Sequence, residues 1–470
     1  MPSYDFICIG SGPAGQKAAV QAAKLGAKVA VISAIRLGGV CINTGTIPSK
    51  TLREAVLDLS GLRQRTVYGV DSLATTVTIE QLLTRTREVI QHEREVVRAQ
   101  LQRNGIDVFH GFGRFENPHE VAFDGEEGSG RISGKHILIS VGTVPSIPAG
   151  LNIDHETLLT SDDILTMPHL PRRMLVAGAG VIGVEYASMF AALGIDVAIC
   201  DVRTSFLDMV DGDIRALFQK QLERAGVTFH LGEKIARVEP GREHTHNVVM
   251  ESGLVLPADV VLVSAGRTGD TAGLQVEKAG LTVDPRGRLV VNSNFQTTVP
   301  HIYAAGDVIG APQLAATSAE QGRLAACHAF NLPSESVPAL FPYGIYAIPE
   351  IAWVGKSEEE LRADNTPYET GIANYREIAR GTILGDSEGL LKMLVHQKTR
   401  DILGVWICGS QATELVHIGQ AVIALGGKLD YFLRTVFNYP TLAECYKVAA
   451  LNGMNKLRAQ GMTKAAPHAG

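Results

Sequence analysis

Two segments of the chain share one pattern, and that pattern limits what the chain can fold into. The sequences "GSGPAGQKAAVQAAKLGAKVAVIS" (10–33) and "GAGVIGVEYASMFAALGIDVAICD" (178–201) align without a gap. Each contains a glycine-rich turn, a helix of small residues, a Leu-Gly stop and a buried apolar strand. This order is typical of half a Rossmann unit, which binds a dinucleotide pyrophosphate at the N-terminus of its helix. The sequence therefore predicts two dinucleotide sites.

The glycines of both turns let the backbone approach an anion closely, and the free N–H groups and dipole of the helix favour its charge. They are Gly10, Gly12 and Gly15 in the first unit and Gly178, Gly180 and Gly183 in the second. The residue that ends the following strand differs between the two units. The first unit has Ser33 where an acid that binds the adenosine ribose is expected, whereas the second has Asp201.

Asp201 and the nearby Arg203 bear on the choice of nucleotide. A carboxylate at this place accepts both ribose hydroxyls and repels a 2′-phosphate, which favours NAD. Arg203 could instead bind the 2′-phosphate of NADP. The two residues together predict that the second unit accepts both NAD and NADP. An ordinary surface arginine is the alternative interpretation of Arg203.

Length and composition exclude several classes of protein. A chain of 470 residues is too long for one core and should divide into about three domains. No stretch of about 18 apolar residues is present that could span a bilayer, and a net charge of −6 disfavours a nucleic-acid or anionic-membrane partner. The six cysteines have no disulfide or zinc spacing and no secretory signal is visible. We therefore expect a cytoplasmic protein without a metal site.

Other segments fit an α/β architecture. Apolar spacing predicts a packing helix with a solvated charged face over 82–105. Residues 135–143 and 258–267 read as strands that end in glycine turns. Alternating residues over 389–409 predict a hairpin, and 412–427 an amphipathic helix.

In this order the motifs resemble the flavoprotein disulfide reductases, the FAD-dependent family that contains lipoamide dehydrogenase and glutathione reductase. The resemblance covers the whole chain and rests on "GSGPAG", "GGVCINTGTIPSK" (38–50), "VGT" (141–143), "GAGVIGVEYAS", "SAGR" (264–267), "IYAAGDV" (302–308) and "NYPTLAE" (438–444). It implies an α/β fold with two Rossmann-like dinucleotide-binding domains, for FAD and for NAD(P), and a C-terminal α+β dimerisation domain. The implied bounds are 1–149 and 271–340 for the FAD-binding domain, 150–270 for the NAD(P)-binding domain and 341–470 for the dimerisation domain.

The resemblance also implies contacts with the cofactors. Asp307 would bind the flavin ribityl chain, and a helix beginning near Ala315 would direct its N-terminus towards the flavin pyrimidine. A plain helix cap is the alternative interpretation of Asp307. Beyond the glycines of the two turns, the other implied cofactor-binding residues are Ser33, Gly39, Cys41, Lys50, Gly113, Thr143, Asp201, Arg203 and Gly266.

Two parts of the disulfide chemistry of that family are changed in this chain. Cys41 holds the place of the first redox cysteine, but Thr46 stands where the flavin-side cysteine is expected, and its hydroxyl neither ionises nor relays electrons near neutral pH. In "NYPTLAE" the place of the general-base histidine is Tyr439, followed by Glu444, and tyrosine titrates near 10. We therefore expect no disulfide half-reaction. A small packed residue is the favoured interpretation of Cys41 over a redox-sensitive thiol.

The residues that would serve the nicotinamide half-reaction are retained. By the resemblance, Lys50 lies at the reactive edge of the flavin and Glu185 pairs with it. A cation there stabilises the charge of the reduced flavin, and the ion pair keeps the lysine in position. Taken singly, each residue would be read as a surface charge. Lys50, Glu185, Thr46, Tyr439 and Glu444 are the predicted residues of the catalytic site.

A flavin that accepts hydride but has no dithiol partner can return it to a second nicotinamide. The resemblance therefore implies ping-pong hydride transfer from NADPH to NAD⁺ through FAD in a homodimer or higher homo-oligomer. "GVCINTGTIPSKTLREAV" and "TVFNYPTLAECYKVAALNGMNK" resemble the soluble pyridine nucleotide transhydrogenases of the family in particular. The alternatives are an NAD(P)H diaphorase or quinone reductase of the same fold and a non-catalytic FAD-binding scaffold. Retention of Lys50, Glu185 and Asp307 disfavours the scaffold.

Overall fold

The structure, a computed structural model, forms two compact units. It describes residues 1–470 except 35, 61–76, 127, 242–244, 335–339 and 462–470. The first unit contains Met1–Ala55, Thr78–Leu170 and Val263–Ser336, and the second contains Val56–Val77, Pro171–Leu262 and Val337–Gly470. Each unit is therefore built from segments that are far apart in the sequence. The predicted bounds of the individual domains stay a prediction.

The first unit is built on a seven-stranded sheet whose order is β3-β2-β1-β6-β5-β4, with β17 also paired to β6. Strands β3, β2, β1, β6 and β17 run parallel, and β4 to β6 form an antiparallel meander. The strands are β1 (Ser3–Ile9), β2 (Val29–Ser33), β3 (Asp107–His110), β4 (Phe112–Asn117), β5 (Glu120–Gly125), β6 (Gly128–Ile139) and β17 (Ile302–Ala304). The buried apolar runs of β1 and β2 suit central parallel strands, which are covered on both faces.

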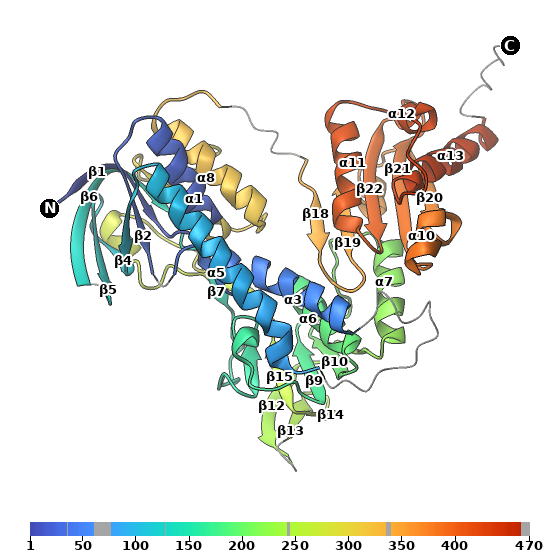
Figure 1. Cartoon of the computed structure of the whole chain (residues 1–470), viewed down its shortest axis with the longest axis horizontal. Helices are drawn as coiled ribbons and strands as arrows, with labels where there is room; N and C mark the ends of the chain where they lie inside the picture. The colour runs from blue at the N-terminus through green and yellow to red at the C-terminus, as the bar shows by residue number, and fades with distance from the viewer. Residues whose placement is uncertain (35, 61–76, 127, 242–244, 335–339, 462–470) are drawn as a thin grey trace. The chain divides into compact units, whose positions relative to one another are not determined.

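Helices α1 (Pro13–Lys24) and α8 (Ala315–Ala329) lie beside each other on this sheet (Figure 1). Small residues permit the close approach, because a Cβ at Gly322 would lie 2.1 Å from the carbonyl oxygen of Ala14. The other helices of this region are α2 (Gly39–Asn43), α3 (Thr46–Leu59) and α5 (Ile79–Arg103). Helix α5 confirms the helix predicted over 82–105, and Thr78 caps it in a capping box with Gln81.

A short antiparallel pair and small connecting elements complete the first unit. Strands β7 (Thr143–Pro145) and β16 (Arg267–Gly269) pair antiparallel. The remaining elements are β8 (Leu158–Thr160) and the short 3₁₀ turns η1 (Ile164–Thr166), η2 (Val276–Ala279) and η3 (Asp307–Ile309). Turn η3 connects β17 to the segment before α8, which brings the "AAGD" motif to the same edge of the sheet as the first glycine turn.

The second unit contains the second Rossmann-like segment. Its parallel strands β11, β10 and β9 are neighbours in that order, and β15 follows β9. Their bounds are β9 (Arg173–Ala177), β10 (Asp196–Asp201), β11 (Thr228–Leu231) and β15 (Val260–Val263), with helices α6 (Val181–Ala192) and α7 (Gly212–Arg224) between them. Strands β12 (Ile235–Pro240), β13 (His246–Met250) and β14 (Val255–Ala258) form a separate antiparallel sheet.

The C-terminal part of the second unit is an antiparallel sheet of order β18-β19-β22-β21-β20. Its strands are β18 (Tyr343–Ile345), β19 (Ile351–Gly355), β20 (Tyr368–Asn374), β21 (Leu390–His396) and β22 (Ile402–Cys408). Strands β21 and β22 confirm the hairpin predicted over 389–409. The helices are α9 (Glu358–Ala363), α10 (Ala379–Leu384), α11 (Ala412–Ala424), α12 (Leu429–Arg434) and α13 (Glu444–Ala459). The predicted α/β fold with a C-terminal α+β domain is therefore confirmed.

Tyr446 ties the two long C-terminal helices together. Its hydroxyl donates to the carbonyl of Leu415 at 2.7 Å and accepts from the amide of Gly419 at 3.0 Å. Helix α13 lies against β20, and the two backbones approach closely at Gly371. A Cβ there would lie only 2.2 Å from the carbonyl oxygen of Ala449, so this contact requires glycine. None of the helices in the described part of the chain combines the length and the apolarity needed to cross a bilayer.

Candidate active site

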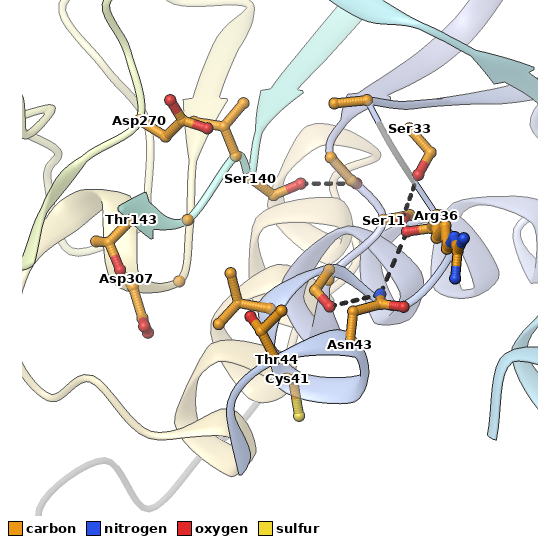
Figure 2. Close-up of a pocket in the computed structure, with 18 of the residues that line it drawn as sticks. Ser11, Ser33, Arg36, Cys41, Asn43, Thr44, Ser140, Thr143, Asp270 and Asp307 are labelled. Carbon is orange, nitrogen blue, oxygen red and sulfur yellow. Dashed lines mark hydrogen bonds between the residues drawn. The ribbon is translucent and has the colours of Figure 1, made fainter. Parts of the chain in front are cut away.

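A cavity of about 850 Å³ opens in the first unit where β1, β2 and β6 end (Figure 2). Ligands of doubly wound sheets bind at the carboxyl ends of the parallel strands, and this volume is that of a site for a cofactor-sized molecule. The cavity brings together many residues that the sequence predicted for the cofactor site. They are Gly10, Gly12, Ser33, Gly39, Cys41, Thr46, Gly113, Thr143, Asp307 and Ala315.

The three glycines of the first turn have different reasons to be glycine. Gly10 has φ +111°, and a Cβ there would lie 2.3 Å from the carbonyl oxygen of Ser140. A Cβ at Gly15 would lie 2.0 Å from the carbonyl oxygen of Gly10. A Cβ at Gly12 would meet no protein atom within 4 Å. The fold therefore requires glycine at the first and third places, whereas at Gly12 only a ligand against the backbone would require it.

The turn before α2 brings a second glycine against the first turn. Gly39 has φ +60°, and a Cβ there would lie 2.9 Å from the Cα of Gly12. Gly38, at the N-cap of α2, also has a left-handed backbone with φ +102°. Bare backbone from both turns therefore forms this part of the cavity wall, beside the N-terminus of α1. Backbone amides at a helix N-terminus form an anion site, which suits a pyrophosphate.

The hydroxyl of Ser33 is bonded to Ser11. The two side-chain oxygens lie 2.7 Å apart (Figure 2). The Ser11 hydroxyl also accepts the amide of Gly38 at 3.2 Å. Ser33 is 2% exposed. Through Ser11, its hydrogen bond connects the end of β2 to the glycine turn and to the start of α2. The sequence prediction of a ribose contact by Ser33 stays a prediction.

Helix α5 contributes to the cavity, which the sequence did not predict. Its charged face was expected to be solvated, but Arg94 lines the cavity, and its Nε donates to Asn43 Oδ1 at 2.6 Å. The Asn43 amide in turn donates to the carbonyl of Gly39 at 2.8 Å. The expectation of a wholly solvated face was therefore wrong for Arg94. Burial and the nearby charge of Arg36 lower the pKa of Arg94. Arg94 and Asn43 are 51 positions apart in the sequence, so no local sequence pattern predicts their hydrogen bond.

Charged side chains lie at both ends of the cavity. Figure 2 shows Asp270 and Asp307 at one end, and Arg36 with Ser33 at the other. Burial raises the pKa of both Asp270 and Asp307, and the Ser318 hydroxyl donates to Asp307 Oδ1 at 3.3 Å. Asp307 begins η3 and its carboxylate faces the cavity. Asp307 is half-buried and lines the cavity; its predicted contact with the flavin ribityl chain stays a prediction.

Arg267 holds the end of the cavity near Thr143. It donates to the Thr143 hydroxyl from Nε at 2.9 Å and to the Thr143 carbonyl from Nη2 at 2.8 Å. Gly266, the preceding residue, has φ +101°, so the "SAGR" turn directs the arginine towards β7. Gly113 meets the side chain of Ile9, since a Cβ there would lie 2.9 Å from Ile9 Cγ2.

Cys41 and Thr46 are neighbours across the turn between α2 and α3. Burial raises the pKa of the Cys41 thiol, although a hydrogen bond with Thr46 opposes the shift. Both residues line the cavity. Lys50 follows one turn later on α3, where its Nζ donates to the Ser49 hydroxyl at 3.4 Å. The opening of α3 thus sets Thr46 at the cavity wall and Lys50 on the same helix.

The second glycine turn repeats the geometry of the first. Gly178 has φ +116°, whereas Gly180 has φ −81° and a Cβ there would meet no protein atom within 4 Å. Asp201 ends β10, and its Oδ2 accepts the backbone amide of Ala179 at 2.7 Å. Arg203 pairs with Asp201 through its guanidinium. The middle glycine of this turn is therefore also open, and the acid after β10 is bonded to the turn itself.

The other predicted catalytic residues lie in the second unit. Glu185 is buried on α6 and its Oε1 accepts the amide of Tyr346 at 2.8 Å. Tyr439 is 69% exposed and Glu444 begins α13, where its Oε2 is buried and accepts no hydrogen bond from a described residue. Lys50 belongs to the first unit, so its predicted pairing with Glu185 stays a prediction.

Comparison with known proteins identifies the family. The pyridine nucleotide-disulphide oxidoreductase family matches residues 4–322, and the dimerisation domain of that family matches residues 341–450. The chain belongs to the pyridine nucleotide-disulphide oxidoreductase family. It is therefore an oxidoreductase.

Similar members of this family have been named or solved. The chain is 51% identical over 463 residues to a soluble pyridine nucleotide transhydrogenase of Mycobacterium bovis (strain BCG / Pasteur 1173P2), covering 98% of this chain and 99% of that protein. It is 40% identical over 459 residues to a protein of the same name from Marinomonas sp. (strain MWYL1), covering 97% and 99%. Among solved structures, a flavoprotein disulfide reductase of Escherichia coli, RclA, has a TM-score of 0.87 at 29% identity, covering 96% of this chain and 100% of that chain. LpdA from Mycobacterium tuberculosis has a TM-score of 0.88 at 25% identity, covering 95% and 99%.

Two residues of this chain differ from what the name of the pyridine nucleotide-disulphide oxidoreductase family leads one to expect. The family name refers to a disulphide, yet this chain has a threonine at 46 and a tyrosine at 439. The open glycines at 12 and 180, by contrast, remain as dinucleotide sites require. The chain therefore has open glycines at both turns and no cysteine at position 46.

Proposed function

We propose that the protein is an FAD-dependent NAD(P)⁺ transhydrogenase, which converts NADPH and NAD⁺ into NADP⁺ and NADH. The observation that carries this proposal is Thr46 at the cavity wall beside Cys41, with both dinucleotide turns retained. A chain that exchanges hydride with nicotinamides but has no dithiol needs another acceptor for the hydride, and the simplest is a second nicotinamide that enters the same site. Relatives of 51% and 40% identity that carry the name soluble pyridine nucleotide transhydrogenase support the same function.

The cavity of the first unit fits FAD. Its volume of about 850 Å³ lies in the range of sites for large cofactors, and the open Cα of Gly12 allows a pyrophosphate to approach the backbone. Asp307, whose half-buried carboxylate faces the cavity, would accept hydroxyls of the ribityl chain. When bound, FAD supplies a ring that takes up a hydride and gives it back.

Protein groups would act on charge and position in this site. Lys50 would stabilise the negative charge that hydride transfer brings to the reacting ring, because a fixed cation lowers the energy of a charge that develops nearby. Glu185 is held by the backbone amide of Tyr346 and would keep Lys50 in position. Thr46 would present a hydroxyl that stays neutral, so electrons would not leave along a sulfur path.

The second glycine turn would bind NAD(H) and NADP(H) in turn. The backbone around Gly180 would receive the pyrophosphate at the N-terminus of α6. Use of one nicotinamide site by both substrates requires that the first product leave before the second substrate binds, which is a ping-pong order. We further propose a homodimer in the cytoplasm, with the exposed Tyr439 and the helix that begins at Glu444 near the subunit contact; the match to the dimerisation domain supports this assembly.

Steady-state kinetics with a spectroscopically distinct acceptor test the proposal. Purified holoenzyme is mixed with NADPH and thio-NAD⁺, and formation of reduced thio-NAD is followed at several fixed concentrations of each substrate. Ping-pong transfer predicts parallel lines in double-reciprocal plots. Absence of turnover with thio-NAD⁺, together with rapid NADPH-dependent reduction of a quinone, would reject the transhydrogenase in favour of a quinone reductase.

A further inference from the structure

Asp201, at the end of β10, accepts four hydrogen bonds in the second unit. Its Oδ2 accepts from the amide of Ala179 at 2.7 Å and from Nη2 of Arg203 at 2.8 Å. Its Oδ1 accepts from the amide of Arg203 at 2.9 Å and from Nε of Arg203 at 3.0 Å. Each carboxylate oxygen thus already receives two donors.

The four bonds fall into a fixed pair and a movable pair. The two backbone amides orient the carboxylate, which has a side-chain exposure of only 7%. The guanidinium lies along the carboxylate with both Nε and Nη2, and its side chain is 46% exposed. Because an arginine side chain rotates freely where it is exposed, the guanidinium can leave Asp201 while the backbone bonds stay.

A ribose and a phosphorylated ribose make opposite demands on this pair. The hydroxyls of an unmodified adenosine ribose donate to a carboxylate and need the oxygen positions that the guanidinium fills. A 2′-phosphate donates nothing of this kind, and it needs a cation because it brings negative charge close to Asp201. Arginine presents five N–H donors, so it can keep two on Asp201 and offer others to a phosphate.

We propose that Arg203 is the specificity-determining residue of the nicotinamide nucleotide site, acting as an internal competitor for the ribose-binding oxygens of Asp201. NADP(H) binds with the guanidinium in place, whereas NAD(H) binds after displacing it. This inference rests on the proposed function, because it concerns how one site serves both nucleotides. Arg203 therefore strengthens binding of one substrate and weakens binding of the other.

Two acids, Asp201 and Asp208, act on the Arg203 guanidinium and favour its charged form. Hydrogen bonds to Asp201 and the charge of nearby Asp208 raise the pKa of Arg203. Asp208 itself accepts the Ser205 hydroxyl at 2.5 Å and Arg215 Nη1 at 3.2 Å. Asp208 therefore already accepts hydrogen bonds from other residues. Displacing Arg203 from Asp201 costs binding free energy, and this cost falls on NAD(H) and not on NADP(H).

Calorimetric titration of the holoenzyme with two nucleotide fragments tests the inference. ADP-ribose stands for NAD, and 2′-phospho-ADP-ribose stands for NADP; neither contains a nicotinamide. In Arg203→Gln, we expect binding of the phosphorylated fragment to weaken by roughly 10- to 100-fold, since one charge-assisted contact is lost. Binding of ADP-ribose should become about 3- to 10-fold stronger because the competitor is gone.

Arg224→Gln is the matched control. Arg224 lies at the C-terminal end of α7, before β11, and forms an exposed ion pair with Glu388. It is therefore at the amino edge of the parallel sheet, away from the nucleotide edge, and the variant removes the same charge from the unit. Both fragments should bind this variant as they bind the unchanged chain.

Unchanged or weaker binding of ADP-ribose by Arg203→Gln would overturn the inference, because an ordinary phosphate-binding arginine affects only the phosphorylated fragment. If Arg203→Gln fails to fold, as judged by bound flavin and circular dichroism, Arg203→Lys replaces it. The lysine keeps the charge but lacks the two-pronged contact, so ADP-ribose should still bind more tightly; if it does not, the inference fails. Fragment binding is independent of hydride transfer, so the expected shifts together with an inactive enzyme would reject the proposed function alone.

Discussion

The Thr46 hydroxyl lies close enough to the Cys41 thiol, across the turn that joins α2 to α3, to act on the pKa of that thiol, and both residues line the cavity. Thr46 therefore stands at the cavity wall beside Cys41, at the place where the family resemblance expects the second sulfur. Burial raises the pKa of the Cys41 thiol, which keeps it protonated near neutral pH and limits its nucleophilicity. The cavity retains one sulfur in a form suited to packing.

Thr46→Cys should rebuild the cysteine pair without rebuilding disulfide reductase activity. Residues 41 and 46 both line the cavity, and Thr46 is near enough to act on the pKa of the Cys41 thiol, so a second sulfur at 46 should lie close to the first and oxidation should remove two titratable thiols. Lipoamide reduction should stay at background because a tyrosine, a residue type that is a poor base at neutral pH, occupies the place of the general-base histidine. Thiol titration and NADH-dependent lipoamide reduction measure both outcomes. Appreciable lipoamide turnover by the single variant would contradict the assignment, and Thr46→Cys/Tyr439→His is the comparison.

Gly12→Ala and Gly180→Ala should separate the two dinucleotide sites. A Cβ at either position meets no protein atom within 4 Å, so the free energy of unfolding should change by no more than about 0.5 kcal/mol. Gly12→Ala should lower the FAD bound per chain, and Gly180→Ala should weaken NADP⁺ binding by about tenfold or more. Flavin absorbance and calorimetry measure these quantities.

Gly10→Ala is the contrasting variant for this pair. Its Cβ would lie 2.3 Å from the carbonyl oxygen of Ser140, and the backbone has φ +111°. We therefore expect Gly10→Ala to destabilise the fold itself. Loss of folding in Gly12→Ala, with normal flavin content in Gly10→Ala, would show that the roles of these glycines have been exchanged.

Arg94→Met should loosen the flavin without unfolding the chain. Arg94 holds Asn43 at 2.6 Å, and Asn43 holds the carbonyl of Gly39 at 2.8 Å, so α5 fixes the short helix that faces the cavity. Loss of the charge-assisted bond should cost about 1.5–3 kcal/mol, and flavin release in dilute denaturant should accelerate. Arg98→Met, an exposed site on the same helix, is the control. Equal release rates for both variants would refute the positioning role.

The glycine turns could be predicted from the sequence because their cause is local. Left-handed backbone at Gly10 and Gly178 and the short helices that follow depend on neighbouring residues, which one stretch of sequence contains. The spacing of apolar residues within each segment likewise predicts the strand of each Rossmann unit and the C-terminal hairpin. These features account for the agreement of the predicted fold class with the structure.

Side-chain partnerships between distant elements could not be predicted in this way. Arg94 was read as part of a solvated face because its helix carries many charges, and only the fold brings Asn43 to it. Ser33 was read as a missing acid, whereas its hydroxyl bonds to Ser11. The sequence singles out Asp201 and Arg203 for the choice of nucleotide, but it predicts neither their hydrogen bonds to each other nor the bond from the amide of Ala179. Such contacts follow from tertiary geometry, which leaves no periodic signal.

Lys392 shows the same limit in the second unit, inside the apolar strand β21. Its side chain is 1% exposed, and Nζ donates to Asp211 Oδ1 at 2.8 Å and to Asp213 Oδ2 at 2.7 Å. It also pairs with Glu358. Burial acts to lower the pKa of Lys392, but the bonds to the three carboxylates outweigh it and raise that pKa. The ammonium therefore supplies the positive charge for an acidic cluster that joins α7, α9 and β21.

Lys392→Met should destabilise the fold by about 3–5 kcal/mol at pH 7, because it leaves buried carboxylates without their cation. The effect of pH on the free energy of unfolding should also have the opposite sign in Lys392→Met and in the unchanged chain. In the unchanged chain, burial raises the pKa of Glu358 but hydrogen bonds from Lys392 and Tyr368 lower it below its usual 4.5. That contribution to stability is complete above the unfolded pKa and is lost as the pH falls through the lowered folded pKa. Without Lys392 the carboxylates should bind protons more readily when folded, so the variant should become more stable between pH 7 and pH 5.

Denaturant midpoints at pH 7 and pH 5 measure this difference for the unchanged chain and for Lys392→Met. Lys356→Met is the control, because Lys356 pairs with Asp364 on the surface with both side chains half exposed, and its midpoint should match that of the unchanged chain at both pH values. If Lys392 stabilises the buried carboxylates by its charge, the loss of stability in Lys392→Met should be smaller at pH 5 than at pH 7. An equal deficit at the two pH values would mean that the variant loses only packing of the lysine stem, and the ionic role of the cluster would be rejected.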